Sequence, residues 1–224
     1  MKVCAYLMTA DTGLAPNPFH GICTLAVCTP NHRRARLKPD DDWIVGLASA
    51  PLRARFIDSN KWRIVYAMCV SEVLELDQYF RDPRFVKKIP KRQGTRIERC
   101  GDNFYRIENG ALRYQKDIAN DHEWDAVQAQ DRYGNKVFVG REYYYFGSKA
   151  KELPDSVSWA DKLKQKFAAS GIGIKYIFGG SSGVQWDDKE RESFLAFLRK
   201  EALPNLPEPK DFSSHWGPET VSCR

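Results

Sequence analysis

The chain has 224 residues, of which 42% are apolar, 12% aromatic and 29% charged, and its formal net charge is +6. This composition is typical of a globular protein and excludes a disordered chain. The roughly 18 consecutive apolar residues that a membrane span needs are absent, and the moderate positive charge permits a polyanionic partner without requiring one.

The first third of the chain predicts a series of strands. Residues 3–10 are an apolar run that begins close to the first methionine and turns polar too soon for a signal peptide, so we expect a strand and a cytoplasmic protein. Residues 21–29 and 41–50 predict two more strands. Residues 61–76 predict a long strand that is central or bent around a barrel, because apolar residues occupy both of its faces.

Two local signals predict the elements that follow. Residues 76–85 predict a short helix that ends before Pro83, because the residue before a proline disfavours helical backbone. Residues 103–116 predict a hairpin, with Asn109 and Gly110 as the centre of a type I′ turn.

The last part of the chain contains the clearest helices. Residues 136–147 predict a strand or a strand pair, and residues 159–170 predict an amphipathic helix. Residues 172–178 predict a further strand. Residues 187–203 predict a helix with acidic residues in its first turn and basic residues near its end.

This order, with strands first and helices mostly at the end, predicts an α+β fold. We expect a curved, mostly antiparallel or mixed sheet with flanking helices and a C-terminal helix. Strands and helices do not alternate as they do in a dinucleotide-binding α/β fold. We expect one domain over residues 1–203 and a loosely packed C-terminal extension over residues 204–224.

Basic side chains gather in three segments of the sequence. Lysine and arginine clusters supply sequence-independent affinity for phosphates, and the alternative is that these side chains only solvate loops. The clusters are Arg33, Arg34, Arg36 and Lys38; Arg53 and Arg55; and Arg84, Lys87, Lys88, Lys91, Arg92, Arg96 and Arg99.

His20, Cys23, Cys28 and His32 are of the residue types that bind zinc. If residues 21–29 form a strand, the two cysteines are an odd number of positions apart and point to opposite faces. We therefore expect no metal site. A nucleophilic Cys23 with His20 as its base stays an alternative.

Polar residues stand where the first strand ends and where a later strand begins. Asp11 follows the first strand and Asn17 stands between two prolines, so both are expected to be held rigidly at one rim of the sheet. A carboxylate and an amide are a suitable pair for binding a nucleobase or a ribose, and Asp102 and Asn103 offer a second polar group. The alternative for all four is turn chemistry, since Asp and Asn favour turns through local hydrogen bonds.

Aromatic residues beside basic ones predict stacking on bases, although core packing is the alternative use. The aromatic residues within 141–146 alternate, so one pair is expected to face outward or into a cleft. The glycine-rich turn at 179–183 could offer backbone amides to an anion, but it lacks the lysine of a phosphate-binding P-loop.

The motifs DTGLAPNPFHGICTLAVCTPNHRR, DDWIVGLAS, RIVYAMCVSEVLELDQYFRDPRF, GDNFY and YYYFG stand in this order over residues 1–150. Together they resemble the second nucleotide modification associated domain family. The resemblance implies a bacterial or phage protein linked to DNA base hypermodification. Near the last strand this chain has GGSSG where we expect a Gly-His element in the family. The resemblance places the matching polar positions at Asp11, Gly13, Asn17, Cys28, Arg33 or Arg34, Asp102 and Asn103.

A second likeness is architectural. DWIVGLAS followed by RIVYAMCVSEV is similar to the paired strands of PUA-like barrels such as the EVE and ASCH domains. That likeness implies binding of nucleic acid or modified bases in a cleft on a small curved sheet, although a fold does not settle a function.

Our leading hypothesis is a protein that binds a nucleotide or a modified base in a cleft at the rim of the sheet. A base inside a duplex must be extruded, or already be free, before such a cleft can bind it. Asp11 and Asn17 would contact base or sugar edges, and Asn103 would be a further nucleotide-binding residue. Arg33, Arg34 and the 84–99 cluster would hold phosphates, and Trp43 or Tyr144 would stack on the base.

Two alternatives stay open. The first is an enzyme that acts on a base or nucleotide with Asp11 or Asp102 as general acid or base, which requires a group of suitable pKa within reach of the substrate. The second is a protein-interaction subunit that contacts no nucleic acid. No cofactor is expected, and the partner in the leading hypothesis is a nucleic acid or a nucleotide.

Overall fold

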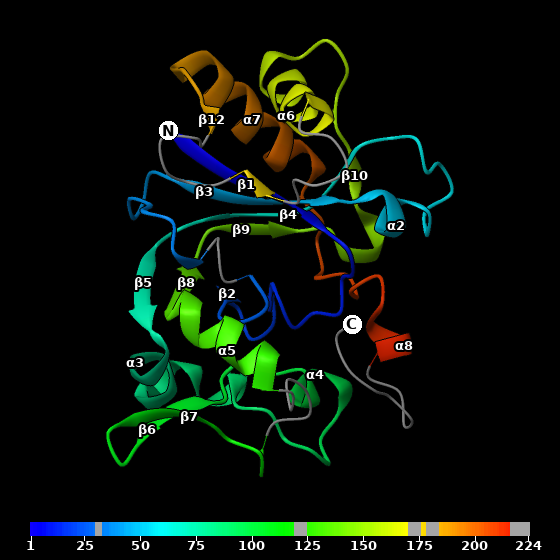
Figure 1. Ribbon diagram of the computed structural model, residues 1–224. Helices are drawn as coiled ribbons and strands as arrows, with labels where there is room; N and C mark the ends of the chain where they lie inside the picture. The colour runs from blue at the N-terminus through cyan, green and yellow to red at the C-terminus, as the bar shows by residue number, and fades with distance from the viewer. Residues whose placement is uncertain (30–32, 119–124, 170–175, 178–183, 216–224) are drawn as a thin grey trace. The chain divides into compact units, whose positions relative to one another are not determined.

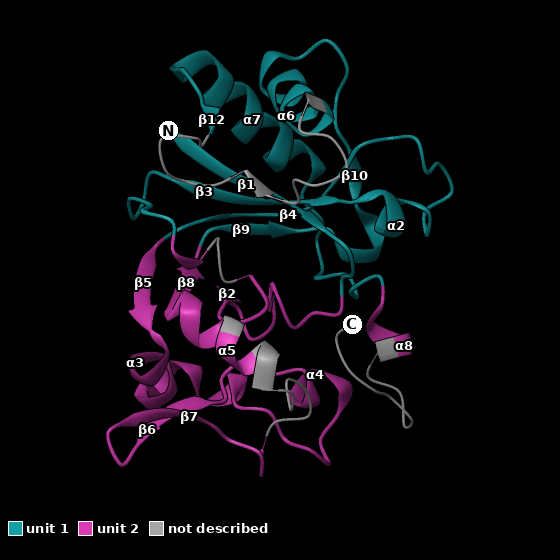
Figure 2. Cartoon of the chain, in the orientation of Figure 1, with its two compact units in different colours: residues 1–11, 35–70, 142–210 teal, residues 12–34, 71–141, 211–224 magenta. Residues whose placement is uncertain are grey.

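The computed structural model of the chain describes residues 1–29, 33–118, 125–169, 176–177 and 184–215. The chain divides into two compact units, each assembled from three separate segments (Figure 2). Each unit is therefore held together by contacts between residues that lie far apart in the sequence. Unit 1 contains residues 1–11, 35–70 and 142–210, and unit 2 contains residues 12–34, 71–141 and 211–224.

Unit 1 is built on a mixed sheet with the strand order β10-β4-β3-β1-β11 (Figure 1). In its centre β1 (Lys2–Met8) runs parallel to β3 (Trp43–Ala48), and β3 runs antiparallel to β4 (Arg63–Cys69). Four short strands pair antiparallel with β4 or β1: β9 (Tyr143–Tyr145), β10 (Lys151–Glu152), β11 (Tyr176–Ile177) and β12 (Val184–Gln185).

The two long helices described in unit 1 cover one face of this sheet. α6 (Ser158–Ala169) and α7 (Asp188–Glu201) lie side by side against it (Figure 1), and Trp159 and Phe194 pack there with the buried strand residues. Both helices were predicted from the sequence and are confirmed. The unit also contains α2 (Ala50–Arg53) and η2 (Gly147–Lys149).

Unit 2 contains a three-stranded antiparallel sheet and a separate hairpin. The sheet has the order β2-β8-β5, with β2 (Cys23–Leu25), β8 (Lys136–Gly140) and β5 (Glu72–Glu75), and the hairpin joins β6 (Tyr105–Glu108) to β7 (Ala111–Tyr114). Aromatic side chains such as Tyr79, Phe85 and Phe104 fill the core of unit 2. The described helices of the unit are α3 (Leu76–Arg81), η1 (Pro83–Lys88), α4 (Arg96–Arg99), α5 (Asp125–Gly134) and α8 (Phe212–His215).

The hairpin and the helix before Pro83 are confirmed. Asn109 and Gly110 have φ angles of 50° and 75°, as a type I′ turn requires. α3 ends at Arg81, and a 3₁₀ helix begins at Pro83 itself, a position where the missing N–H of proline is tolerated.

The single long strand predicted over 61–76 is wrong. The segment forms two strands, β4 and β5, which belong to different sheets. The break lies between two neighbouring residues whose backbone N–H groups find different partners. Val70 N–H donates to Asp42 O at 2.9 Å, whereas Ser71 N–H donates to Val139 O at 2.7 Å. Apolar residues on both faces predicted burial correctly for β4 but not for β5, where Val73 is exposed, and they did not show where the pairing partner changes.

The strand predicted over 21–29 is too long. β2 ends at Leu25, and Cys28 has a positive φ of 65°. The alternation argument that separated Cys23 from Cys28 therefore does not apply. No three His, Cys, Asp or Glu side chains among the described residues are grouped so that they could hold a metal ion. His32 and the 179–183 turn lie outside the described residues.

The α+β class with mixed and antiparallel sheets is confirmed. In the part of the chain that the structure describes, the outer strands β10 and β11 do not pair with each other, so the sheet of unit 1 does not close into a barrel. No described helix has the length and apolar character needed to cross a membrane. Within residues 204–215, Glu208 O accepts a hydrogen bond from Ser148 N at 2.8 Å, and Asp211 and Phe212 are buried.

Helix α4 depends on a capping box that titrates. Glu98 accepts hydrogen bonds from Lys91 Nζ at 2.7 Å and from the backbone and side chain of Thr95, and these contacts lower the pKa of Glu98 to about 2. Because the folded pKa lies below the ordinary value of 4.5, the contribution to stability is complete above pH 4.5 and is lost as the pH falls through about 2.

We therefore expect Glu98→Gln to be slightly less stable than the wild type at pH 7 and equally stable near pH 2. Thermal unfolding at a series of pH values measures this difference. A gap between the two proteins that is independent of pH would contradict the assignment.

Candidate functional site

Six polar side chains lie together in the interior of unit 2, and we call them the buried polar cluster. None exposes more than 2% of its surface. They come from segments as far apart in sequence as the loop before β2 and the segment before β6. Polar groups at this depth destabilise a fold unless they are hydrogen-bonded. The members are Asn17, Thr24, Tyr79, Lys88, Asp102 and Asn103.

Lys88 is the centre of the buried polar cluster. Its Nζ donates to Asn17 O and Asn17 Oδ1, both at 2.8 Å, and to Ile22 O at 2.7 Å. Burial lowers the pKa of Lys88, while the Asp102 carboxylate acts in the opposite direction. Three oxygen acceptors match the three N–H donors of an ammonium group, and a neutral amine could serve only two of them. The geometry therefore favours the charged form.

Asp102 is held by two hydroxyl groups. Tyr79 OH donates to Asp102 Oδ1 at 2.6 Å, and Thr24 Oγ1 donates to Asp102 Oδ2 at 2.7 Å. Burial raises the pKa of Asp102, whereas the charge of Lys88 and the two hydroxyl donors act to lower it. The carboxylate has no exposed surface, so in this structure it braces β2 against α3.

The two asparagines tie loops to this centre. Asn17 Nδ2 donates to Cys100 O at 2.9 Å. Asn103 Nδ2 donates to Tyr79 O at 3.1 Å and to Phe85 O at 3.3 Å. Its Oδ1 is buried and has no hydrogen-bond partner in the part of the chain that the structure describes. The structure thus brings together three residues singled out from the sequence, Asn17, Asp102 and Asn103, but it places them inside unit 2.

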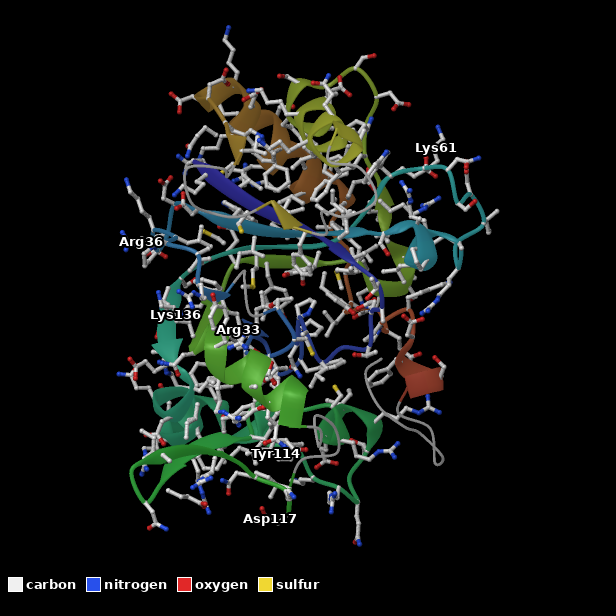
Figure 3. The ribbon with its side chains drawn as sticks, viewed as in Figure 1. Arg33, Arg36, Lys61, Tyr114, Asp117 and Lys136 are labelled. Atoms are coloured by element: carbon white, nitrogen blue, oxygen red, sulfur yellow. The ribbon has the colours of Figure 1, made fainter. Side chains whose placement is uncertain are left out.

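Arg33 and Arg34 are neighbours with opposite environments. Arg33 is completely buried, where it forms an ion pair with Asp131 at 3.2 Å and donates to Asp131 O and to Lys136 O (Figure 3). Burial lowers the pKa of Arg33, and Asp131 acts against that shift. Arg34 is exposed, and its guanidinium lies 4.1 Å from the ring centre of Tyr133. Of these two arginines, Arg34 is the one that solvent reaches.

The other three predicted residues belong to unit 1. Asp11 is 1% exposed, and it accepts hydrogen bonds from Tyr145 OH at 2.6 Å and Lys210 N at 2.8 Å. Trp43 is buried, with its ring stacked on Tyr144 at 6.3 Å. Tyr144 is partly exposed and lines a small cavity of about 270 Å³ together with residues such as Leu203.

Several basic side chains of the segment 84–99 form ion pairs or hydrogen bonds within the chain. Arg84 forms ion pairs with Glu72 at 2.7 Å and with Asp82 at 2.6 Å, and Lys91 forms one with Glu98. Lys88 is part of the buried polar cluster. This segment therefore presents less free positive charge than its composition predicts.

The cysteine alternative receives no support from the geometry. Cys23 is completely buried, and that burial raises the pKa of its thiol to about 12. A nucleophilic cysteine requires an accessible thiolate at neutral pH, which this environment disfavours.

A second cavity lies in unit 2 along the β6–β7 hairpin, and we call it the basic pocket. Its volume is about 750 Å³, within the roughly 300–1,000 Å³ of small-molecule sites. Figure 3 shows Tyr114 and Asp117 close together at the end of β7, and both line it. The lining residues are Arg106, Glu108, Ala111, Leu112, Arg113, Tyr114, Gln115, Lys116, Asp117, Gln128 and Arg132.

The hairpin register explains the charge of the basic pocket. Arg106 lies opposite Arg113 in the antiparallel pair, so both side chains share one face of the hairpin. Arg106 is paired with Glu108 at 2.6 Å. Among the described residues the structure gives no ion-pair partner for the cations that remain. They are Arg113, Lys116 and Arg132.

A family model described as nucleotide modification associated domain 2 matches residues 1–172. The chain belongs to this family. The nucleotide modification associated domain 2 match covers the whole buried polar cluster and the whole basic pocket, and it associates the chain with nucleotide modification. It confirms the resemblance recognised from the sequence. No curated protein and no solved structure matches the chain.

Sequence reasoning missed two parts of this nucleotide modification associated domain. Lys88 was only one of several basic residues, and nothing local distinguishes it from its neighbour Lys87. The basic pocket could have been found in part from the sequence. A hairpin that turns at Asn109-Gly110 places Arg106 opposite Arg113, so two arginines are expected on one face.

Proposed function

We propose that this chain binds a nucleotide in the basic pocket as its part in nucleotide modification. The observation that carries the proposal is the set of three cations, Arg113, Lys116 and Arg132, which line one cavity without an ion-pair partner among the described residues. Of the two acidic lining residues, Glu108 is paired with Arg106, and Asp117 balances part of this charge. An anionic ligand would neutralise the remainder.

A phosphate group fits this set of donors. Guanidinium groups bind phosphate oxygens through paired, charge-assisted hydrogen bonds, which are about twice as strong as neutral ones. Lys116 adds a flexible point charge. Gln115, Gln128 and Tyr114 line the same cavity, so a sugar or base bound there would lie against amide and aromatic side chains.

The basic pocket does not contain the carboxylates and asparagines that the sequence suggested for nucleotide binding or catalysis. Asp11, Asn17, Asp102 and Asn103 are buried, and each side chain forms at least one hydrogen bond with another part of the chain. We therefore assign them to shaping the units. The exposed Arg34 stays a candidate for an additional phosphate contact.

Arg113→Ala and Arg132→Ala are each expected to weaken nucleotide binding about 10-fold or more, because each removes a charge-assisted contact of roughly 1.5–3 kcal/mol. Isothermal titration with deoxynucleoside mono- and diphosphates measures this effect. Lys87→Ala, which removes an exposed cation outside the pocket, is the matched control and should bind like the wild type.

Unchanged affinity in both pocket variants would contradict the proposal. Failure of the wild type to bind any nucleotide would favour the interaction-subunit alternative. Conversion of a bound nucleotide into a new product would favour the enzyme.

A further inference from the structure

The segment that joins α2 to β4 in unit 1 combines positive charge with aromatic rings, and we call it the arginine–aromatic patch. From Arg53 to Arg63 the sequence has four cations and one acid, Asp58. Lys210, from the end of the unit, adds a further cation. Figure 3 shows Lys61 on this loop. The patch consists of Arg53, Arg55, Phe56, Lys61, Trp62, Arg63 and Lys210.

Each aromatic ring of the arginine–aromatic patch has a cation beside it. The guanidinium of Arg53 lies 4.4 Å from the ring centre of Trp62. Arg63 and Lys210 lie 5.3 Å and 4.7 Å from the ring centre of Phe56. Both rings are partly exposed. An arginine guanidinium held against a ring in this way is itself a flat surface on which a base can stack.

The framework under the patch is firm. The ring of Trp62 stacks on Phe167 of α6 with 6.1 Å between their centres, and Arg63 is fixed by Glu152 at 2.7 Å and by Ala150 O at 3.2 Å. Arg53 has a buried Nε with no hydrogen-bond partner among the described residues, and burial lowers the pKa of Arg53. Arg55 and Lys61 are exposed. The rings are held in defined positions next to exposed charges, so the patch is preorganised for binding a ligand.

We propose that the arginine–aromatic patch binds a single-stranded nucleic acid. Proteins that bind single strands combine a positive surface along the backbone with aromatic rings on which bases stack. The patch has both kinds of group on one short segment. The family's association with nucleotide modification is consistent with a polynucleotide partner. This inference rests on unit 1 alone and does not depend on the basic pocket of unit 2.

The test is the double variant Arg55→Glu/Lys61→Glu, which alters exposed side chains and leaves the rings in place. Its matched control is Arg36→Glu/Lys38→Glu, which changes the charge of the same unit by the same amount at other exposed positions. Figure 3 shows Arg36 and Lys61 at opposite sides of unit 1. Binding of a labelled oligothymidylate is measured by fluorescence anisotropy at several salt concentrations.

We expect the patch variant to bind at least 10-fold more weakly than the control. Its dependence of log K on log salt should be shallower by about 0.7 for each phosphate that the protein no longer neutralises. Equal weakening in both variants would show an effect of net charge only and overturn the proposal. So would a wild type that does not bind, or that binds a duplex as tightly as the single strand. Binding of a mononucleotide should be the same in both variants, so failure of the basic pocket and failure of the patch are distinguishable.

Discussion

Lys88→Met is expected to lower the free energy of unfolding by about 3–5 kcal/mol, the usual effect of removing one member of a buried charge pair. The substitution keeps most of the side-chain volume but removes three hydrogen-bond donors. Asn17 O, Asn17 Oδ1 and Ile22 O then lose their partner in a place that water does not reach. The carboxylate of Asp102 also loses the positive charge that stabilises it.

The matched control is Lys87→Met. Lys87 is the preceding residue of the same 3₁₀ helix, but it is exposed. Its replacement should change stability by no more than about 0.5 kcal/mol, as is usual for surface positions. Urea unfolding followed by tyrosine and tryptophan fluorescence measures both variants. Equal stability of the two variants would show that the buried polar cluster is not organised around Lys88.

Arg33→Met is expected to have an effect of similar size, about 3–5 kcal/mol, because it removes the guanidinium that forms a buried ion pair with Asp131. Asp131 would keep hydrogen bonds from Cys28 N at 2.8 Å and from Tyr105 OH at 3.0 Å. These two neutral donors provide hydrogen bonds to the carboxylate oxygens of Asp131 but do not neutralise its negative charge. Arg34→Met is the control. It should lower the free energy of unfolding by no more than about 1 kcal/mol, the usual contribution of a cation–π contact at an exposed site.

A double variant separates charge from packing at this pair. Arg33→Met/Asp131→Asn removes both charges, so it should recover part of the stability that Arg33→Met alone removes. The single variant Asp131→Asn completes the comparison. If the double variant loses as much stability as Arg33→Met and Asp131→Asn lose together, the two side chains are not directly coupled. The result also matters for binding studies, because weaker nucleotide binding in Arg33→Met would follow from a destabilised unit 2 and would not identify a phosphate contact.

These two pairs of neighbours show the limit of charge patterns in the sequence. Lys87 and Lys88, or Arg33 and Arg34, are equivalent in composition and local pattern. Burial separates them, and burial depends on partners that lie far away in the chain: Asn17 for Lys88, and Asp131 for Arg33. A cluster of basic residues therefore predicted a surface where the structure has, in part, an interior.

The sequence by itself determined the features that depend on neighbouring residues. The Asn109-Gly110 turn, the helix that ends before Pro83, the capped helix α7, the α+β class and the family all follow from residue types at short spacing. For the turn and the two helices the deciding energy is local: a positive φ, a missing N–H or a cap.

Only the tertiary structure decided where strands change partner and which polar groups are enclosed. The segment 61–76 has one apolar pattern, yet it serves two sheets because Val70 and Ser71 pair with different strands. Asn17, Lys88 and Asp102 meet only after three segments fold together. The basic pocket likewise needs the β6–β7 hairpin and α5 in one unit. Such sites arise from long-range pairing and packing, which short-range residue patterns do not encode.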